Sequence, residues 1–592
     1  MTRVRLSRGA VVIVLGLGLV PAAVGACGED RGPGFVVRDT KFESDAAVLD
    51  APECKLQCSL DGRSVIETCS GAVVETCPPE LACGAASCVE PCAAAALDRS
   101  SNGCEFYFQA PRIKKTWPQG CYAAFVVNTS VQPAKLDLEL EGKALDLSNA
   151  VFRTNPGSAT LIPHEGEIAP GESVIVFVSD RSPGAPPETW EGLRSPCPEG
   201  VVPASYTDPV PNRSGIGRSY HLTSTVPVAT TAIYPFGGAP SWLPSATVVL
   251  PVATWEKEHM LVNAWELSPV GGGPFAQIVA SEDDTEITLV PKRDVEDGLG
   301  VRGGLAGSTL TYKLAKGQFL QLVQDQELTG SILLSNKPTG VFGGQSVANV
   351  PTEIGTADIL SQQIPAYQQW GSEYVGVGYR PRLGDEHEPL FYRIVAAKDG
   401  TRLDYDPTIP PGAPTSLSAG EVAMFRYGTG DAFVVRTQDI DHPIYVAAYM
   451  TGGMEYQTQG DPEFVNVVPT GQYLSSYSFY ADPTYAQTSL VVVRAKSRGA
   501  FQDVWLDCAG YLSGWKPVGE RGQYEWVRVD LRRDRGPGDR FGDKVCQAGL
   551  QRMRSEGPFT ATVWGWDEAA SYAYPGGMAQ RKLVDAPLAE VH

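Results

Sequence analysis

Twelve cysteines besides Cys27 give this chain its clearest chemistry, because cysteines pair as disulfides in an oxidising compartment. Their number is even, and eight crowd into one short segment, which predicts a small disulfide-stapled module with little core of its own. A zinc cluster is the alternative, but the segment lacks CxxC pairs and nearby histidines. Outside it, Cys121 is expected to pair with Cys197, and Cys508 with Cys546. The dense set is Cys54, Cys58, Cys69, Cys77, Cys83, Cys88, Cys92 and Cys104.

Cys27 is set apart by the residues that precede it. Three arginines, an uncharged apolar run over residues 9–20 and small residues lead to Val24-Gly-Ala-Cys27, which is the order of parts in a secretion signal. The end of this segment resembles the lipobox of bacterial lipoproteins, in which the thiol carries a lipid after cleavage before the cysteine. Several acyl chains anchor durably, because each buried methylene adds roughly 0.8 kcal/mol. The sequence therefore predicts a signal peptide over residues 1–26 and a lipidated Cys27.

One short cluster, Asp385-Glu-His-Glu388, brings several potential metal ligands together. Oxygen-rich loops hold calcium, and His387 would add a nitrogen that zinc accepts. A solvated acidic loop is the favoured alternative, so no metal or other cofactor is predicted. Asp385 and Glu388 would also be the acid and base of a polysaccharide-cleaving enzyme. We predict no catalytic site, because the sequence contains no GxSxG elbow, Walker loop or HExxH motif.

Four aromatic residues, Trp242, Trp255, Trp370 and Tyr473, lie in connections between expected strands. Exposed aromatic rings stack on sugars or anchor protein partners, so these residues are the candidate ligand-binding side chains. Core packing is the favoured alternative, because the aromatic residue recurs at one position of a repeat, as a structural requirement would demand.

The segments that position these residues have the pattern of short β-strands. Residues 135–140, Lys-Leu-Asp-Leu-Glu-Leu, alternate between polar and apolar, as a half-buried strand does. The 63 glycines and 46 prolines make long helices hard to place and favour a fold rich in turns. We therefore predict an all-β fold.

An internal repeat organises the β-region. Pro227, Pro338 and Pro443 each open an apolar run that leads to a further proline and then an aromatic residue, and they lie 111 and then 105 residues apart. This period is about the length of one β-sandwich and too long for a four-stranded propeller blade. The prediction is tandem β-sandwich-like modules, with a β-propeller of two blades per repeat as the alternative.

Changes in composition along the chain set the expected domain bounds. Residues 27–50 are polar, rich in glycine and aspartate, and predict a flexible tether. The disulfide-rich module is expected at residues 51–104, and the β-repeat region at residues 105–592. Its approximate modules are residues 105–250, 251–365, 366–470 and 471–580.

The net charge of −20 excludes one class of partner. Removal of the expected signal, with three arginines and no acids, leaves about −23. Nucleic acid is not expected as a partner, because phosphate neutralisation requires a basic surface. Contact with a membrane is expected only through the lipid anchor.

Four passages, at residues 340–351, 357–365, 460–469 and 571–577, follow one another in an order that is typical of one family. They resemble the IgGFc-binding domain family, found at the N-terminus of a mucus Fc-γ-binding protein and in bacterial surface lipoproteins. The resemblance covers roughly residues 104–578 and implies an extracellular binding or adhesive role, without established catalytic residues.

These observations together predict a cell-envelope lipoprotein, anchored at the outer membrane or cell surface. Its β-modules are expected to bind an extracellular glycan, mucin-like or protein ligand without catalysis. An extracellular polysaccharide-active enzyme and a purely structural envelope component are the two alternatives.

Overall fold

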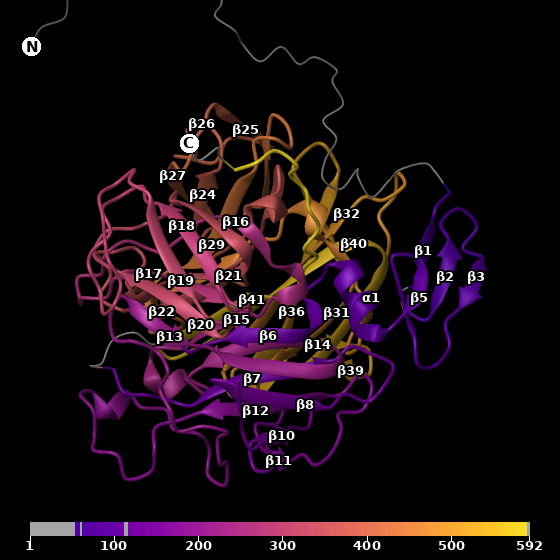
Figure 1. Ribbon diagram of the computed structural model, residues 1–592. Coiled ribbons are helices and arrows are strands. Elements are labelled where there is room, and N and C mark those ends of the chain that lie inside the picture. The colour runs from indigo at the N-terminus through magenta and orange to yellow at the C-terminus, as the bar shows by residue number, and fades with distance from the viewer. Residues whose placement is uncertain (1–53, 60–61, 112–116, 589–592) are drawn as a thin grey trace, which may run out of the picture. The chain divides into compact units, whose positions relative to one another are not determined.

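Figure 1 shows the computed structural model, which describes residues 54–59, 62–111 and 117–588. The described residues all belong to one compact unit, Glu43–His592. The predicted signal peptide, lipidated Cys27 and tether therefore lie outside the described residues. No helix in the described part is long and apolar enough to cross a membrane.

The described chain begins with a small module held together mainly by disulfides. A three-stranded sheet and a two-stranded hairpin precede the single α-helix of the described residues, α1 (Pro91–Asp98). Proline in the first helical turn is favourable, because an N–H at that position would have no helical partner. The strands are β1 (Leu56–Cys58), β2 (Ser64–Glu67), β3 (Val73–Thr76), β4 (Ala82–Gly84) and β5 (Ser87–Val89). The disulfides are Cys54–Cys69, Cys58–Cys83, Cys77–Cys88 and Cys92–Cys104.

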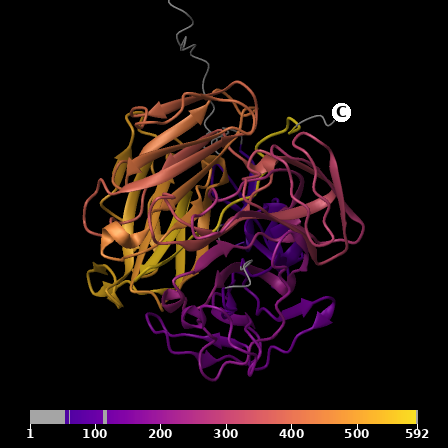
Figure 2. The ribbon, with the colours of Figure 1, turned by 90° about the vertical axis from the view of Figure 1, so that its left-hand side faces the viewer.

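The remainder of the described chain consists of strands and short 3-10 turns, so the predicted all-β fold is confirmed. The strands form four successive sandwich-like modules, which Figure 2 separates by colour from purple to yellow. Buried apolar residues fill each module, and their clusters also cross the module boundaries. The cluster of the fourth module continues onto one face of the first, and another cluster joins the second module to the third. The two disulfides predicted for this region are present as Cys121–Cys197 and Cys508–Cys546.

Each of the first two modules contains one long strand that runs through both of its layers. This strand is β14 in the first module and β21 in the second. Strands of the first are β6 (Asn102–Phe108), β7 (Tyr122–Asn128), β8 (Leu136–Leu140), β9 (Lys143–Ala144), β10 (Val151–Arg153), β11 (Ile162–Pro163), β12 (Ser173–Ser179), β14 (Tyr220–Tyr234) and β15 (Ser245–Val248). Strands of the second are β13 (Gly215–Arg218), β16 (Glu256–Met260), β17 (Pro274–Ala280), β18 (Thr285–Val290), β19 (Leu310–Leu314), β20 (Gln318–Val323), β21 (Ile332–Ala348) and β22 (Asp358–Ile364).

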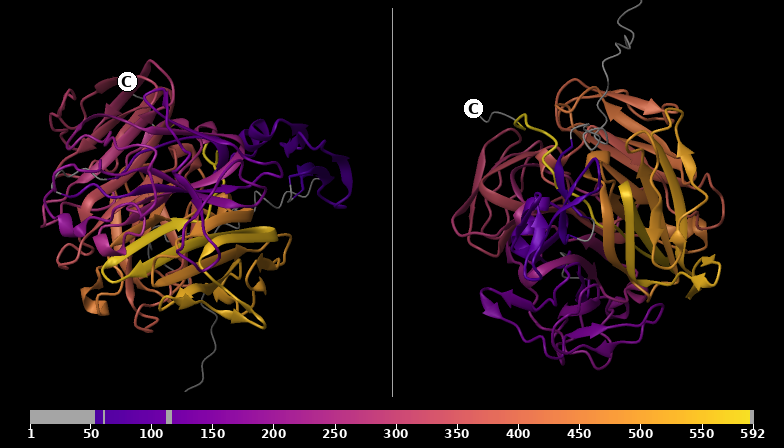
Figure 3. Two further views of the ribbon diagram at one scale, coloured as in Figure 1. Left: turned by 90° about the horizontal axis from the view of Figure 1, so that it is seen from below. Right: turned by 90° about the vertical axis from the view of Figure 1, so that its right-hand side faces the viewer.

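The third module divides its strands between two separate sheets. The fourth module again contains one long strand, β40, that runs through both of its layers (Figure 3). Strands of the third are β23 (Glu373–Gly376), β24 (Pro389–Ala396), β25 (Thr401–Asp406), β26 (Ser416–Leu417), β27 (Val422–Gly428), β28 (Phe433–Thr437), β29 (Ile444–Met450) and β30 (Glu463–Asn466). Strands of the fourth are β31 (Leu474–Ala481), β32 (Gln487–Ala495), β33 (Val504–Leu506), β34 (Gly510–Tyr511), β35 (Lys516–Val518), β36 (Tyr524–Arg533), β37 (Gly536–Pro537), β38 (Arg540–Phe541), β39 (Lys544–Val545), β40 (Gly549–Asp567) and β41 (Ala570–Pro575).

The repeated prolines mark the point where each long strand changes layers. Pro227 lies within β14, Pro338 within β21 and Pro558 within β40, and the pairing register shifts beside each. Proline has no backbone N–H to donate, so the ladder is interrupted and the strand bends towards the second layer. In the third module no single strand runs through both layers. The chain leaves the ladder after β28, and Pro443 directly precedes β29.

Four inner strands, β15, β22, β30 and β41, one from each module, lie against one another in that cyclic order. Each pairs with the second half of its own module's long strand, or with β29 in the third module. The fully buried Gln362 on β22 connects them, because its Nε2 donates to the carbonyls of Ala246 at 2.8 Å, Phe464 at 3.0 Å and Ala573 at 3.0 Å. The amide has two N–H groups, one of which is shared between two carbonyls, and it thus reaches acceptors on the three other inner strands.

Candidate functional site

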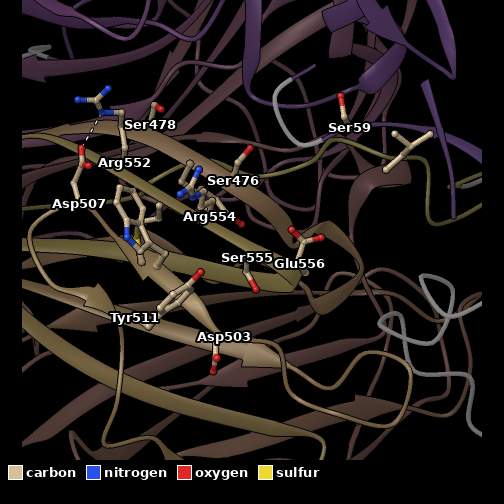
Figure 4. A pocket seen from close by; sticks show the side chains of 14 residues that line it. Ser59, Ser476, Ser478, Asp503, Asp507, Tyr511, Arg552, Arg554, Ser555 and Glu556 are labelled. Atoms are coloured by element: carbon tan, nitrogen blue, oxygen red, sulfur yellow. Dashed lines mark hydrogen bonds and ion pairs between the residues drawn. The ribbon is translucent and has the colours of Figure 1, made fainter. Parts of the chain in front are cut away.

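A groove of about 760 Å³ lies over the outward face of the fourth module (Figure 4). Strands β31, β40 and β33 form its floor, the hairpin strand β34 carries one wall, and Ser59 and Ile66 line it from the disulfide-rich module. Concave surfaces with aromatic and convergent polar side chains are the usual form of a ligand site, so this groove is the candidate functional site.

Strand register places one row of chemically different side chains across the groove. Ser476 on β31 opposes Arg554 on β40, Arg554 opposes Trp505 on β33, and Trp505 opposes Tyr511 on β34. Directly opposed residues of antiparallel strands point to the same face. With strands about 4.8 Å apart, the row spans roughly 14 Å, the length of a short oligomeric ligand.

Arg554 is the group in this row with unused binding capacity. Its guanidinium carbon lies 4.7 Å from the ring centroid of Trp505, a cation–π contact that holds the side chain over the sheet. Among the described residues the guanidinium of Arg554 has no ion pair and no hydrogen bond. Its planar set of N–H donors is therefore oriented and available to an oxygen-rich ligand.

Charged and hydroxyl side chains flank the row on both sides. Ser478 opposes Arg552, whose Nε is 2.9 Å from Oδ2 of Asp507, the contact drawn in Figure 4. Asp503 and Glu556 lie towards the other end of the groove, and both are exposed. The groove thus offers donors and acceptors on either side of an aromatic surface, of which Tyr511 is 69% exposed.

The sequence of β40 explains why these side chains face outward. From Gln551 to Glu556, buried and exposed residues alternate, with Arg552, Arg554 and Glu556 exposed and the residues between them buried. This is the two-residue period of a strand with one solvated face. Neither this alternation nor the binding positions of Trp505 and Tyr511 were predicted from the sequence, because binding aromatics were expected only in the connections of the repeat.

Three of the four aromatic residues predicted to bind ligand do not reach the surface, and that prediction is wrong for them. Trp255, Trp370 and Tyr473 are 6%, 1% and 1% exposed. They follow the short turns η4 (Val252–Thr254), η5 (Tyr367–Gln369) and η7 (Thr470–Gln472), one after each of the first three inner strands.

These turns explain why an aromatic residue recurs at this position. The indole Nε1 of Trp255 donates to the Leu250 carbonyl at 3.1 Å, and that of Trp370 to the Pro365 carbonyl at 3.0 Å. The packing alternative therefore holds for the buried three. Trp242 differs, because its side chain is 49% exposed.

The weak metal candidates Asp385, His387 and Glu388 do not converge. Glu388 is buried, with Oε1 2.7 Å from Nε of Arg382, whereas His387 is exposed and its Nδ1 lies 3.0 Å from Asp431. The idea that Asp385 and Glu388 act as an acid and a base loses its support for the same reason. No group of three or more His, Cys, Asp or Glu side chains within the described ranges is arranged to hold a metal ion.

One protein family matches most of the repeat region. The family model described as "IgGFc binding protein" matches residues 245–565, more than half of the chain and nearly all of the groove, which confirms the resemblance. No curated protein matches the chain. A solved structure, the anti-sigma factor domain-containing protein from Clostridium clariflavum, aligns with 77% of this chain and 99% of its own at 8% identity. Its TM-score of 0.10 carries no argument about fold or function.

Proposed function

Because the chain belongs to the IgGFc-binding protein family, we propose that it is a lipid-anchored cell-envelope protein that binds extracellular glycans in the groove of its fourth module. The family description supports a binding role. The glycan ligand, the anchor and the location at the outer membrane or cell surface are the parts that belong to the proposal.

The observation that carries the proposal is the row Ser476, Arg554, Trp505 and Tyr511. A sugar ring presents a C–H face, which stacks on an exposed aromatic ring such as Tyr511, and hydroxyl groups at its edge. The guanidinium of Arg554 donates to those hydroxyl groups, while Glu556 accepts from them. Both kinds of contact are available within one groove, which favours glycans over purely apolar ligands.

The disulfides support a location outside the cytoplasm. All twelve cysteines of the described residues are paired, including Cys121 with Cys197 across 76 positions. Disulfides of this density persist in oxidising compartments. Metabolic labelling with a palmitate analogue tests the anchor, and we expect label on the wild-type chain and none on Cys27→Ser. Equal labelling of both chains would refute lipid attachment at Cys27.

Binding to an array of polysaccharides, mucins and immunoglobulins tests the groove. We expect the full chain to bind to glycans on the array. We expect Arg554→Gln and Tyr511→Ala each to weaken this binding about tenfold, because each removes one direct contact. Arg540→Gln is the matched control, since Arg540 is also an exposed arginine of the fourth module but lies outside the groove. Unchanged binding by both groove variants would count against the proposal.

A further inference from the structure

Two exposed tryptophans of the first module adopt a backbone conformation that bulky residues rarely adopt. Trp190 has φ 62° and Trp242 has φ 56°, both in the left-handed region, and their side chains are 61% and 49% exposed. Large residues with positive φ are outliers that persist only where the surroundings impose them, and such strain gathers at binding sites. Neither the strained backbone nor the exposure of these two large apolar rings stabilises the fold. A binding role would account for both features.

The fold brings these two residues to one place. Trp190 precedes the turn η2 (Glu191–Leu193), Trp242 follows the turn η3 (Ala239–Ser241), and η2 lies against η3. Trp117 stacks on Trp190, with ring centroids 6.0 Å apart and planes inclined by 27°. We call Trp117, Trp190 and Trp242 the tryptophan platform.

Ion pairs fix the turn that carries Trp190. The guanidinium of Arg181 binds Glu191 through two hydrogen bonds, each 2.6 Å long. Arg194, directly after the turn, donates to Oδ1 of Asp180 at 2.8 Å. Bidentate arginine–carboxylate pairs hold their geometry well, so the platform is ordered before any ligand arrives.

Further contacts tie the same segment to the core of the first module. The Cys197 backbone N–H donates to Oδ2 of Asp180 at 2.9 Å, and Cys197 is disulfide-bonded to Cys121 beside β7. The carboxylate of Glu188 accepts from the Gln119 backbone N–H at 2.6 Å. A binding surface that is already rigid loses less conformational entropy when it binds, so rigidity favours a stacking ligand.

The described charges around the platform favour one kind of ligand. Arg181, Arg194, Asp180, Glu188 and Glu191 are all engaged in the contacts just described, so none of these five side chains is left over for an ionic ligand. Among the described residues, these five side chains carry a net negative charge, which favours a neutral ligand over an anionic one. The indole N–H groups of Trp190 and Trp242 have no hydrogen-bond partner among the described residues and remain available to hydroxyl groups.

We infer that the tryptophan platform is a second binding site, which takes a neutral polysaccharide by stacking pyranose rings on Trp190 and Trp242. Ring faces supply the contact area and the two indole N–H groups supply hydrogen bonds to sugar hydroxyls. This site uses other residues than the groove, and it combines stacking with neutral indole donors where the groove combines stacking with charged side chains. It goes beyond the proposed function and stands or fails separately from it.

Glycine substitutions separate binding from folding at this site. Trp190→Gly and Trp242→Gly remove the rings and also the positive-φ strain, since glycine adopts that conformation readily. We expect the double variant of the full chain, purified in detergent, to keep the melting temperature of the wild type. Its retardation by hydroxyethylcellulose, laminarin or dextran in native gels should weaken at least tenfold.

A matched pair of polymers tests the selection for neutral ligands. Hydroxyethylcellulose and carboxymethylcellulose share one backbone, and only the second is an anion. We expect tighter binding of hydroxyethylcellulose, and we expect Arg540→Gln to leave this binding unchanged, because Arg540 is an exposed arginine that lies outside both the platform and the groove.

Three results would overturn the inference. They are full binding by the double variant, tighter binding of carboxymethylcellulose than of hydroxyethylcellulose, and failure of all three neutral polymers to bind the wild type. Loss of binding to a deglycosylated mucin polypeptide in the double variant, without any neutral-glycan binding by the wild type, would assign the platform to protein recognition instead. The variants Arg554→Gln and Tyr511→Ala test the groove separately.

Discussion

Asp461 is a buried carboxylic acid beside the inner strand β30, and burial raises its pKa to about 7. The charge of Arg382 opposes this rise, and the carboxyl groups of Asp358 and Glu463 are buried nearby with pKa values that burial also raises. In an unfolded chain an aspartate ionises near pH 4. The folded state therefore keeps a proton that the unfolded state loses between about pH 4 and pH 7.

The free energy of unfolding should consequently fall as the pH rises through this window. The contribution of Asp461 is fully present below about pH 4 and is lost by about pH 7, with a change of roughly 2–3 kcal/mol between pH 5 and pH 8. Asp461→Asn should flatten the dependence by that amount, as denaturant titrations at both pH values would show. Asp585→Asn is the control, because Asp585 is almost fully exposed. An unchanged slope in Asp461→Asn would contradict the assignment.

At the scale of elements, the four inner strands depend on one side chain. If Gln362 is replaced by alanine, the buried carbonyls of Ala246, Phe464 and Ala573 lose their shared donor. A buried acceptor left without a donor costs about 1–3 kcal/mol, so we expect Gln362→Ala to lower the free energy of unfolding by at least about 2 kcal/mol. Denaturant unfolding against the control Gln523→Ala, at an exposed glutamine, measures the difference. A loss no larger than that of the control would show that the inner strands do not need this amide.

The repeated elements were largely predictable from the sequence, because the chemistry of proline acts locally. Pro227, Pro338 and Pro443 revealed three repeats, and the structure adds a fourth at Pro558. The sequence concealed this copy, because no aromatic residue follows Pro575 where Trp255, Trp370 and Tyr473 follow the other inner strands. The same recurrence showed that these aromatics serve packing, although it could not show which ring is exposed.

At the scale of the whole molecule, the binding surfaces were not predictable from the sequence. Ser476 and Arg554 are far apart along the chain, and only the pairing of β31, β40, β33 and β34 brings them into one row with Trp505 and Tyr511. Register depends on the whole sheet, so no local pattern specifies it. The burial of Glu388 was not predictable for a related reason. Its acidic neighbours indicate a solvated loop, whereas its ion-pair partner Arg382 is buried.

The central claim is that the fourth module recognises sugars rather than polypeptide, and one ligand-side treatment tests it directly. Mild periodate cleaves vicinal diols of sugars and leaves the mucin polypeptide chain in place. Surface plasmon resonance of the full chain over immobilised mucin, before and after periodate, should show at least a tenfold loss of affinity, with the remaining binding insensitive to Arg554→Gln. Equal affinity for treated and untreated mucin, still lowered by Arg554→Gln, would contradict the account and place a polypeptide in the groove.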